Sequence, residues 1–425
     1  MSSEIAFEMV ASTIRFGSGV TREVGMDLAD GKLKRVMVLT DPNLRALPPV
    51  STVLNSLDEQ KIHYKLFDQV RIEPTDESFR EAIRVATEGR FDSFVAIGGG
   101  STIDTAKAAN LYSTHPGDFL DYVNPPIGKG LPVPGPLKPL IAIPTTAGTG
   151  SETTGVAIFD LVKLHVKTGI AHRRLKPSLA LVDPDNTLTQ PRQVSASAGL
   201  DVLSHALESY TAIPFDRRQY PEKPSLRPAY QGSNPISDVW ALEALRIVSQ
   251  HLIKAVEDPL DMESKSKMLL AACYAGIGFG NAGVHLPHGM SYPISGMIRT
   301  YQPDGYPVHH PMVPHGISVI LSAPAVFRFT ASESLERHGR AAQILGAKAT
   351  QAQSKDAGQY LADQMIQLMQ RLKVPNGLAA LGYTLDDIPL LVKGTLPQHR
   401  VTKLSPRPAG EEELSKLFEE SMVIW

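Results

Sequence analysis

The chain has 425 residues, a formal net charge of −2 at pH 7 and a single cysteine, Cys273. Its length suffices for two domains, and its near-neutral charge gives no electrostatic case for a nucleic-acid or membrane partner. One cysteine excludes an internal disulfide and a thiolate-rich metal site, which is consistent with a reducing compartment. The acidic start of the chain resembles neither a signal peptide nor an Arg-rich transit peptide, so we expect a soluble protein.

Residues 1–190 alternate between strand-like and helix-like patterns. Buried strands are expected at 35–40, 94–97, 140–143 and 179–182, and helices at 76–88 and 102–111. This alternation predicts a mostly parallel sheet with helices on both faces. We therefore assign residues 1–190 to an α/β dinucleotide-binding domain.

A glycine-rich segment, Gly98-Gly-Gly-Ser101, separates the strand that ends at Ile97 from the helix that begins near Thr102. Glycines let the backbone approach a ligand, and free amides at a helix N-terminus bind phosphate. Ile103 stands where the Rossmann fingerprint has its third glycine, so the segment is not that motif. A tight structural turn is the alternative interpretation.

A second segment, Pro144–Glu152, is rich in glycine and threonine and is interpreted as the other wall of the nucleotide pocket. Asp41 follows the first predicted strand, where a carboxylate can bind a ribose diol and repel a 2′-phosphate, which favours NAD over NADP. The alternative for Asp41 is a turn residue before Pro42. The complete set of predicted NAD-binding residues is Asp41, Gly98, Gly99, Gly100, Ser101, Asp104, Thr145, Thr146, Thr149 and Lys167.

After residue 190 the strand patterns fade, and long helical periodicities follow at 238–256 and 351–372. We expect residues 191–425 to form a helical domain that carries the metal and substrate sites. Three proline-rich loops, at 124–139, 213–235 and 301–314, are interpreted either as functional lids or as surface insertions.

Asp201 and His205 stand four residues apart in a predicted helix, so their side chains share one face. Five further histidines lie within 31 residues: His285, His288, His309, His310 and His315. One carboxylate with several imidazoles favours a catalytic divalent metal over a structural zinc site. The alternatives are a carboxylate that stabilises a helix start and histidines that lie on the surface or in the core.

These motifs together resemble the iron-containing (group III) alcohol dehydrogenases over nearly the whole chain. Gly98–Lys107 and Pro144–Glu152 resemble the nucleotide-binding segments of that family. The resemblance implies four metal ligands: Asp201, His205, His288 in Pro287-His-Gly-Met290 and His315 in Pro314-His-Gly316. It also implies an α/β N-terminal domain followed by an all-α C-terminal domain, as in dehydroquinate synthase, and a homodimer. Fe(II) is implied by the family, although three nitrogens and one oxygen suit Zn(II) equally.

Further segments, among them Arg71–Thr75, Ala229–Ser237 and Gly278–Val284, resemble the hydroxyacid–oxoacid transhydrogenase branch. That branch oxidises 4-hydroxybutyrate to succinic semialdehyde while it reduces 2-oxoglutarate to D-2-hydroxyglutarate through bound NAD. One alternative is a conventional NAD-dependent alcohol or 4-hydroxybutyrate dehydrogenase that releases NADH. Another is a non-redox metal lyase of the dehydroquinate synthase type. Animal members of that branch are mitochondrial, and this chain starts without a recognisable presequence. We therefore expect either a bacterial cytoplasmic protein or a processed eukaryotic form in the mitochondrial matrix.

Two departures from the family concern catalysis. Tyr292 stands where many members carry a histidine four residues after the third ligand, so a proton relay and simple packing are both open for it. Residues 299–311 resemble an insertion, and we expect Arg299 with His309 or His310 to bind the substrate carboxylate. Arg400 and Lys403 are weaker candidates for that role, and a solvated basic loop is the alternative.

Overall fold

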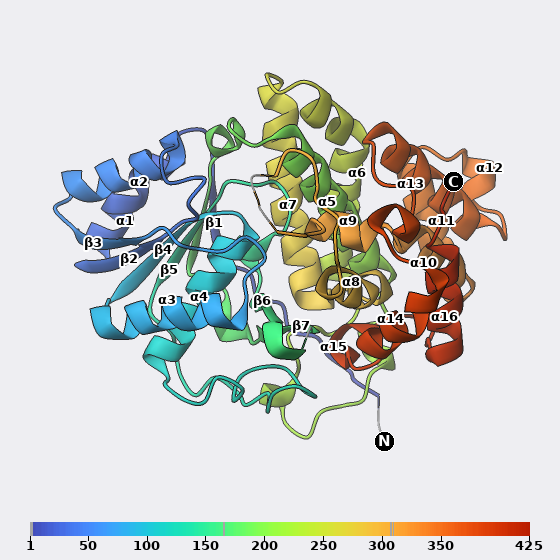
Figure 1. Cartoon of the computed structure of the whole chain (residues 1–425), viewed down its shortest axis with the longest axis horizontal. Helices are drawn as coiled ribbons and strands as arrows, with labels where there is room; N and C mark the ends of the chain where they lie inside the picture. The colour runs from blue at the N-terminus through green and yellow to red at the C-terminus, as the bar shows by residue number, and fades with distance from the viewer. Residues whose placement is uncertain (1–2, 165, 307, 309) are drawn as a thin grey trace. The chain divides into compact units, whose positions relative to one another are not determined.

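The computed structural model describes residues 3–164, 166–306, 308 and 310–425, and it divides into two compact units (Figure 1). One unit is Val10–Gln190, and the other joins Met1–Met9 with Pro191–Trp425. Residues 3–9 thus pack with the helical unit, which the sequence pattern did not indicate. Polar contacts explain this: Glu4 pairs with Arg227 at 2.9 Å, and the Glu8 amide donates to Gln231 Oε1 at 2.9 Å.

The first unit is built on a six-stranded sheet in which every pair of neighbours is parallel. In sheet order its strands are β1 (Thr13–Phe16), β8 (Leu179–Val182), β5 (Leu140–Pro144), β4 (Ser93–Gly98), β2 (Arg35–Leu39) and β3 (His63–Phe67). A separate antiparallel hairpin is formed by β6 (Val156–Leu161) and β7 (Val166–Ala171). The predicted α/β class is confirmed for this half of the chain.

Helices cover both faces of this sheet because successive strand side chains point to opposite sides. In β2, Val36 and Val38 pack in one core with residues of α1 (Val24–Asp30) and α2 (Pro48–Glu59). Met37 and Leu39 pack in the other core with α3 (Asp76–Gly89) and α4 (Gly100–Thr114). Figure 1 shows the two helix pairs on opposite sides of the strands.

The second unit is helical, as predicted. Its helices are α5 (Arg192–Thr211), α6 (Pro235–Glu257), α7 (Met262–Ala282), α8 (Leu286–Gly296), α9 (His315–Ile320), α10 (Ala323–Thr330), α11 (Leu335–Ile344), α12 (Ala349–Ala352), α13 (Ala357–Arg371), α14 (Ile388–Thr395), α15 (His399–Thr402) and α16 (Glu411–Glu420). The helix predicted at 351–372 is interrupted, because Ser354 accepts the Asp356 amide at 3.2 Å in a turn between α12 and α13.

A sharp bend between α7 and α8 sets the direction of α8. Gly283 occupies the bend with φ +97, and a Cβ there would lie 2.4 Å from Leu404 Cδ1 and 2.9 Å from Tyr230 Cβ. Only glycine provides both this backbone conformation and this clearance.

Among the described residues, no helix alone has the length and apolar composition to cross a membrane. The α7–α8 pair meets that test only when taken together across a bend of 102°.

Candidate active site

Asp41 and the first predicted nucleotide-binding segment follow two neighbouring strands, β2 and β4. The chain runs from β2 to β3 at the sheet edge and then returns to β4 on the other side of β2, so the strand order reverses here. Open parallel sheets bind ligands beyond the carboxyl ends of the strands at such a reversal. Asp41 follows β2 and Gly98–Ser101 follows β4, so both lie at this end of the sheet.

The two glycine-containing segments lie against each other. A Cβ on Gly100 would lie 2.6 Å from Thr149 Cγ2, and one on Gly99 would lie 3.3 Å from Thr146 Oγ1. α4 begins at Gly100, and its N-cap residue Gly99 has no side chain to satisfy the first amides. A helix start of this kind, closely approached by threonines, suits a phosphate group.

Two of the predicted NAD-binding side chains, those of Asp104 and Lys167, have partners inside the first unit. Asp104 accepts hydrogen bonds from Ser151 Oγ at 2.5 Å and from the Ile158 amide at 2.9 Å. Lys167 is almost fully buried and pairs with Glu73 at 2.7 Å. These contacts connect α4 and the β6–β7 hairpin to the rest of the unit, so they support the fold around the pocket.

Asp41 makes the hydrogen bonds of a turn residue, and its binding of a ribose stays a prediction. Its Oδ1 accepts the amides of Asn43 at 2.9 Å and Leu44 at 3.2 Å. Burial raises the pKa of Asp41 above its ordinary value. Ser101 Oγ accepts the Glu73 amide at 3.2 Å.

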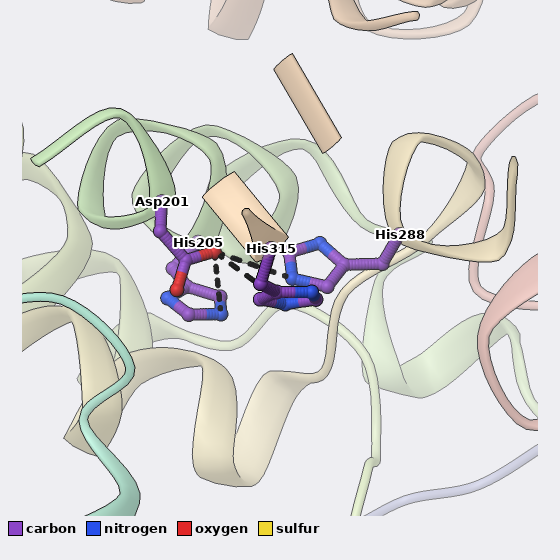
Figure 2. Close-up of side chains that lie close together, drawn as sticks. All are labelled: Asp201, His205, His288 and His315. Atoms are coloured by element: carbon purple, nitrogen blue, oxygen red, sulfur yellow. Dashed lines mark ion pairs between the residues drawn. The ribbon is translucent and has the colours of Figure 1, made fainter. Parts of the chain in front are cut away.

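The structure brings the four predicted metal ligands together in the helical unit (Figure 2). Asp201 and His205 extend from α5, His288 from α8 and His315 from the first residue of α9. Their candidate ligand atoms all lie within 4.8 Å of one another. From Asp201 Oδ1, the Nε2 atoms of the three histidines lie at 3.6, 3.8 and 3.7 Å. Ligand atoms about 3.4 Å apart are expected around a tetrahedral ion with bonds of about 2.1 Å, so the cluster fits one divalent cation.

Close packing of α9 on α5 brings His315 into this cluster. A Cβ on Gly316 would lie 2.0 Å from the Ser197 carbonyl oxygen and 3.1 Å from Asp201 Cβ. Glycine after His315 therefore lets the two helices approach until their ligands meet. On the other side, the His205 ring stacks on Phe279 with centroids 3.9 Å apart, which holds that imidazole in place.

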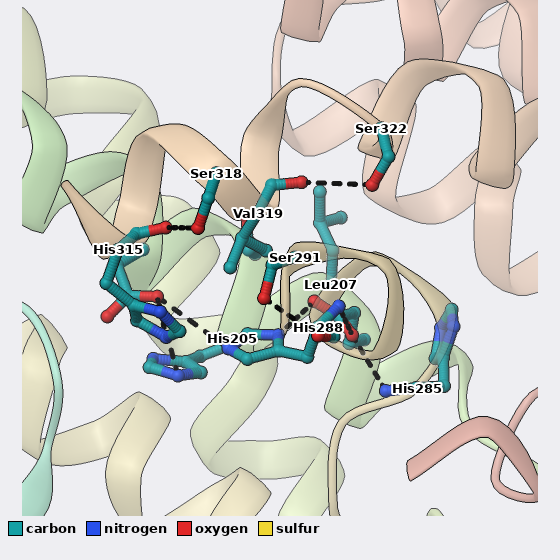
Figure 3. Close-up of polar contacts among 12 residues, drawn as sticks. His205, Leu207, His285, His288, Ser291, His315, Ser318, Val319 and Ser322 are labelled. Atoms are coloured by element: carbon teal, nitrogen blue, oxygen red, sulfur yellow. Dashed lines mark hydrogen bonds and ion pairs between the residues drawn. The ribbon is translucent and has the colours of Figure 1, made fainter. Parts of the chain in front are cut away.

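The sequence interpretation missed Glu208, which binds the ligand His288. Its Oε1 lies 2.6 Å from His288 Nδ1, and its Oε2 accepts the amides of His285 at 2.7 Å and His288 at 3.3 Å. The sequence could have indicated this contact, because residues 201, 205 and 208 follow the i, i+4, i+7 spacing of one helix face. Glu208 is therefore expected on the same face as the two ligands of that helix. Figure 3 shows the hydrogen bonds around His285 and His288.

This contact sets the tautomer of His288. With Nδ1–H donated to Glu208, the lone pair of Nε2 faces the cluster, which is the arrangement that metal-ligating histidines adopt. Nε2 is buried and has no hydrogen-bond partner among the described residues. Burial, assisted by the positive charge of Arg400, lowers the pKa of His288 to about 3. The imidazole is therefore neutral, as a metal ligand must be.

The remaining histidines of the region are outside the cluster. His285 is fully buried, and its Nε2 lies 3.0 Å from Thr211 Oγ1. His310 is not one of the clustered residues. His309, expected to take part in the carboxylate clamp, lies outside the described residues.

Tyr292 and Arg299, the other two predicted catalytic residues, have different surroundings. Tyr292 is buried on α8, one turn after His288, and its hydroxyl accepts a hydrogen bond from Arg400 Nη2 at 2.7 Å. Arg299 has a 58% exposed side chain that forms an ion pair with Asp387. Its guanidinium thus already has a carboxylate partner within the protein.

Two family models cover most of the chain. The model described as iron-containing alcohol dehydrogenase matches residues 11–184, and the C-terminal model of the same family matches residues 229–422. The chain belongs to the iron-containing alcohol dehydrogenase family. The predicted family is therefore confirmed, and this member of it is an oxidoreductase.

Relatives and solved structures agree with the family assignment. Mitochondrial hydroxyacid-oxoacid transhydrogenases from Bos taurus and Homo sapiens are 61% and 58% identical, each over 100% of this chain and 91% of the relative. The structure of a 1,3-propanediol oxidoreductase superposes with a TM-score of 0.85 at 26% identity, covering 98% of this chain and 100% of that one. The structure of sulfoacetaldehyde reductase from Bifidobacterium kashiwanohense in complex with NAD+ superposes with a TM-score of 0.77 at 26% identity. The match covers 98% of this chain and 99% of that one.

Proposed function

We propose that this iron-containing alcohol dehydrogenase family member is a hydroxyacid–oxoacid transhydrogenase. In the proposed cycle, 4-hydroxybutyrate loses a hydride and a proton to become succinic semialdehyde. 2-Oxoglutarate takes up a hydride and a proton to become D-2-hydroxyglutarate, so no external reductant is consumed. The observation that carries the proposal is the 61% identity to a transhydrogenase over the whole chain, combined with an assembled Asp–His₃ cluster.

The proposed cofactors are NAD and Fe(II). The NAD+ complex of sulfoacetaldehyde reductase and the position of Gly98–Ser101 at the strand-order reversal support NAD. A dication with Asp201 and three neutral histidines gives a site of net charge +1. The family favours Fe(II), while the ligand set suits Zn(II) equally. Metal analysis of the purified protein, followed by reconstitution of the metal-free chain with each ion, distinguishes the two.

When bound, the metal would supply a Lewis acid for the substrate hydroxyl, and NAD would supply a hydride acceptor. The chain itself orients these groups. Asp201 and the three histidines hold the cation, and Glu208 keeps His288 in the ligating tautomer. Tyr292 Oη accepts an N–H from Arg400 and retains its own O–H, so we assign to it a hydrogen bond to the reacting oxygen. A Tyr292→Phe variant is expected to lower kcat more than it raises KM.

One experiment separates the proposal from a conventional dehydrogenase. The purified metal-loaded enzyme is incubated with 4-hydroxybutyrate and 2-oxoglutarate without added NAD, and D-2-hydroxyglutarate is measured. Formation of many equivalents per bound nicotinamide supports transhydrogenation. Turnover only with free NAD, accompanied by NADH accumulation, contradicts it and favours the conventional enzyme. An Asp201→Ala variant, which lacks a ligand, is expected to be inactive in both assays.

The assembly and the compartment are also proposed. A homodimer is expected from the family, and sedimentation of the purified chain tests it. The mitochondrial description of the relatives from Bos taurus and Homo sapiens supports a matrix location over a bacterial cytoplasmic one. Fractionation of the source cells distinguishes the two compartments.

A further inference from the structure

A guanidinium that has no carboxylate partner among the described residues lies beside the metal cluster. Arg400, on α15, donates from Nη2 to Tyr292 Oη at 2.7 Å and lies over the Tyr230 ring with its Cζ 5.0 Å from the ring centroid. Its Nη1 is buried and makes no hydrogen bond to the described residues. No Asp or Glu in the described part of the chain forms an ion pair with Arg400, in contrast to Arg299.

A buried cation is costly unless an anion or several hydrogen bonds compensate it. Its neighbours Tyr292 and Tyr230 are neutral phenols, and they leave Nη1 of the five-donor guanidinium without a hydrogen bond to the described residues. With a dication at the cluster, the region carries two positive centres and favours an anionic ligand.

Tight backbone packing positions this guanidinium relative to the metal ligands. A Cβ on Gly289, the residue after His288, would lie 2.9 Å from Thr402 Cγ2 and 3.4 Å from Val401 Cγ2. α15 is therefore seated directly on the part of α8 that carries the ligand. On the other side, the clearance at Gly283 lets Tyr230 pack beneath the guanidinium.

We propose that Arg400 binds the substrate carboxylate and thereby selects hydroxy acids and oxo acids over uncharged alcohols. This inference rests on the proposed transhydrogenase function and names the residue that gives the site its substrate class. It replaces Arg299 as the expected carboxylate anchor, because Arg299 is exposed and already paired with Asp387.

The chemistry of the two proposed substrates fits a single anchor. In 4-hydroxybutyrate, two methylene groups separate the reacting carbon from the carboxylate. In 2-oxoglutarate, two methylene groups separate the keto carbon from the distal carboxylate. One arginine at a fixed position relative to the metal can therefore hold both molecules with the reacting carbon in the same place.

The test compares an acid with its uncharged analogue of the same length. Wild type, Arg400→Gln and Arg400→Lys are assayed as metal-loaded enzymes with added NAD, using 4-hydroxybutyrate and 4-hydroxybutyramide. In Arg400→Gln, kcat/KM for the acid is expected to fall about 100-fold, as when one partner of a buried charge pair is removed. The value for the amide falls only through the lost Arg400–Tyr292 hydrogen bond, so its loss is expected to be at least about tenfold smaller than the loss for the acid. Arg400→Lys is expected to recover part of the loss for the acid.

Arg407→Gln is the matched control, because Arg407 is an exposed arginine that also lies over an aromatic ring, Phe329, at 4.1 Å. It is expected to behave as wild type with both substrates. An equal loss for acid and amide in Arg400→Gln, or no loss at all, overturns the proposal. A selective loss of the acid in Arg299→Gln but not in Arg400→Gln also overturns it.

A binding measurement separates this inference from the proposed function. Glutarate, which carries two carboxylates and no reacting group, is titrated calorimetrically into metal-loaded wild type and Arg400→Gln. Binding that weakens at least about 30-fold in the variant supports the anchor, even if wild type fails to convert 4-hydroxybutyrate and 2-oxoglutarate. That failure overturns the transhydrogenase proposal alone. Equal glutarate affinity in both proteins overturns the role of Arg400, whatever the reaction is.

Discussion

Glu208 Oε1 lies 2.6 Å from His288 Nδ1, and both groups are buried. The carboxylate comes from α5, which also carries Asp201 and His205, so one helix supplies two ligands and orients a third. Its second oxygen accepts two backbone amides at the start of α8. Glu208 therefore connects the metal cluster to the helix that carries both His288 and Tyr292.

Removal of this carboxylate is expected to weaken the metal site without removing a ligand. Glu208→Gln preserves the size of the side chain but replaces one acceptor oxygen with an amide donor, so His288 loses its fixed tautomer. Metal affinity is expected to fall about 10–100-fold, measured by competition with a chelator. Glu243→Gln, which removes an exposed carboxylate paired with Arg246 on α6, is the control. Equal metal affinity in both variants contradicts the orienting role.

Gly316→Ala tests the close approach of α9 to α5. The added methyl would lie 2.0 Å from the Ser197 carbonyl oxygen, so α9 must move and carry His315 away from Asp201. Metal affinity is expected to fall at least about tenfold, and overpacking is expected to lower the free energy of unfolding of the metal-free protein by about 1–3 kcal/mol. Gly410→Ala is the control, because its nearest neighbour is the flexible end of Glu413 at 3.2 Å. A Gly316→Ala protein that binds metal as tightly as wild type excludes this account.

Gly100→Ala tests the contact between the two nucleotide-binding segments. Its Cβ would lie 2.6 Å from Thr149 Cγ2, which pushes the start of α4 away from the second segment. NADH affinity, followed by fluorescence titration, is expected to fall at least about tenfold, roughly 1.4 kcal/mol. Adding Thr149→Ser removes the obstructing methyl while keeping the hydroxyl, and it should restore part of the affinity. An unchanged affinity in Gly100→Ala would show that the contact is irrelevant to the cofactor.

Lys176 is expected to make stability depend on pH. Burial lowers the pKa of Lys176 to about 7, well below its value of about 10.4 in an unfolded chain. Between these values the unfolded state binds the extra proton and the folded state does not. The free energy of unfolding therefore rises with pH from about 7 to 10, by at most about 1.4 kcal/mol per unit from this group.

Denaturant unfolding of wild type and Lys176→Met across pH 6–10 measures this contribution. The free energy of unfolding of wild type, measured relative to that of Lys176→Met, should increase as the pH rises. Lys34→Met, at an exposed position, serves as the control and should leave the pH profile of wild type unchanged. A pH-independent difference for Lys176→Met contradicts the lowered pKa.

Much of the fold could be predicted because its central strands and its helices are marked by patterns of neighbouring residues in the sequence. The predicted segments at 35–40, 94–97, 140–143 and 179–182 correspond to β2, β4, β5 and β8, since central parallel strands are continuous apolar runs. β3 at the sheet edge was not predicted, because its side chains alternate between exposed and partly buried positions and include His63 and Lys65. The association of the first residues with the helical unit rests on contacts with residues more than 200 positions away, which no local pattern reports.

The sequence by itself determined those features that depend on helix and strand geometry over a few neighbouring residues. It placed Asp201 and His205 on one helix face, and it placed a glycine segment between a buried strand and a helix. The family resemblance implied that His288 and His315 join that pair. Only the tertiary structure decided the contacts around them, with Glu208 against His288 and with His285, the residue before α8, against Thr211. It also decided that Arg299 has a partner in Asp387 while Arg400 has none among the described carboxylates. Burial and ion pairing depend on how distant segments pack, and the spacing of residues along the chain does not contain that information.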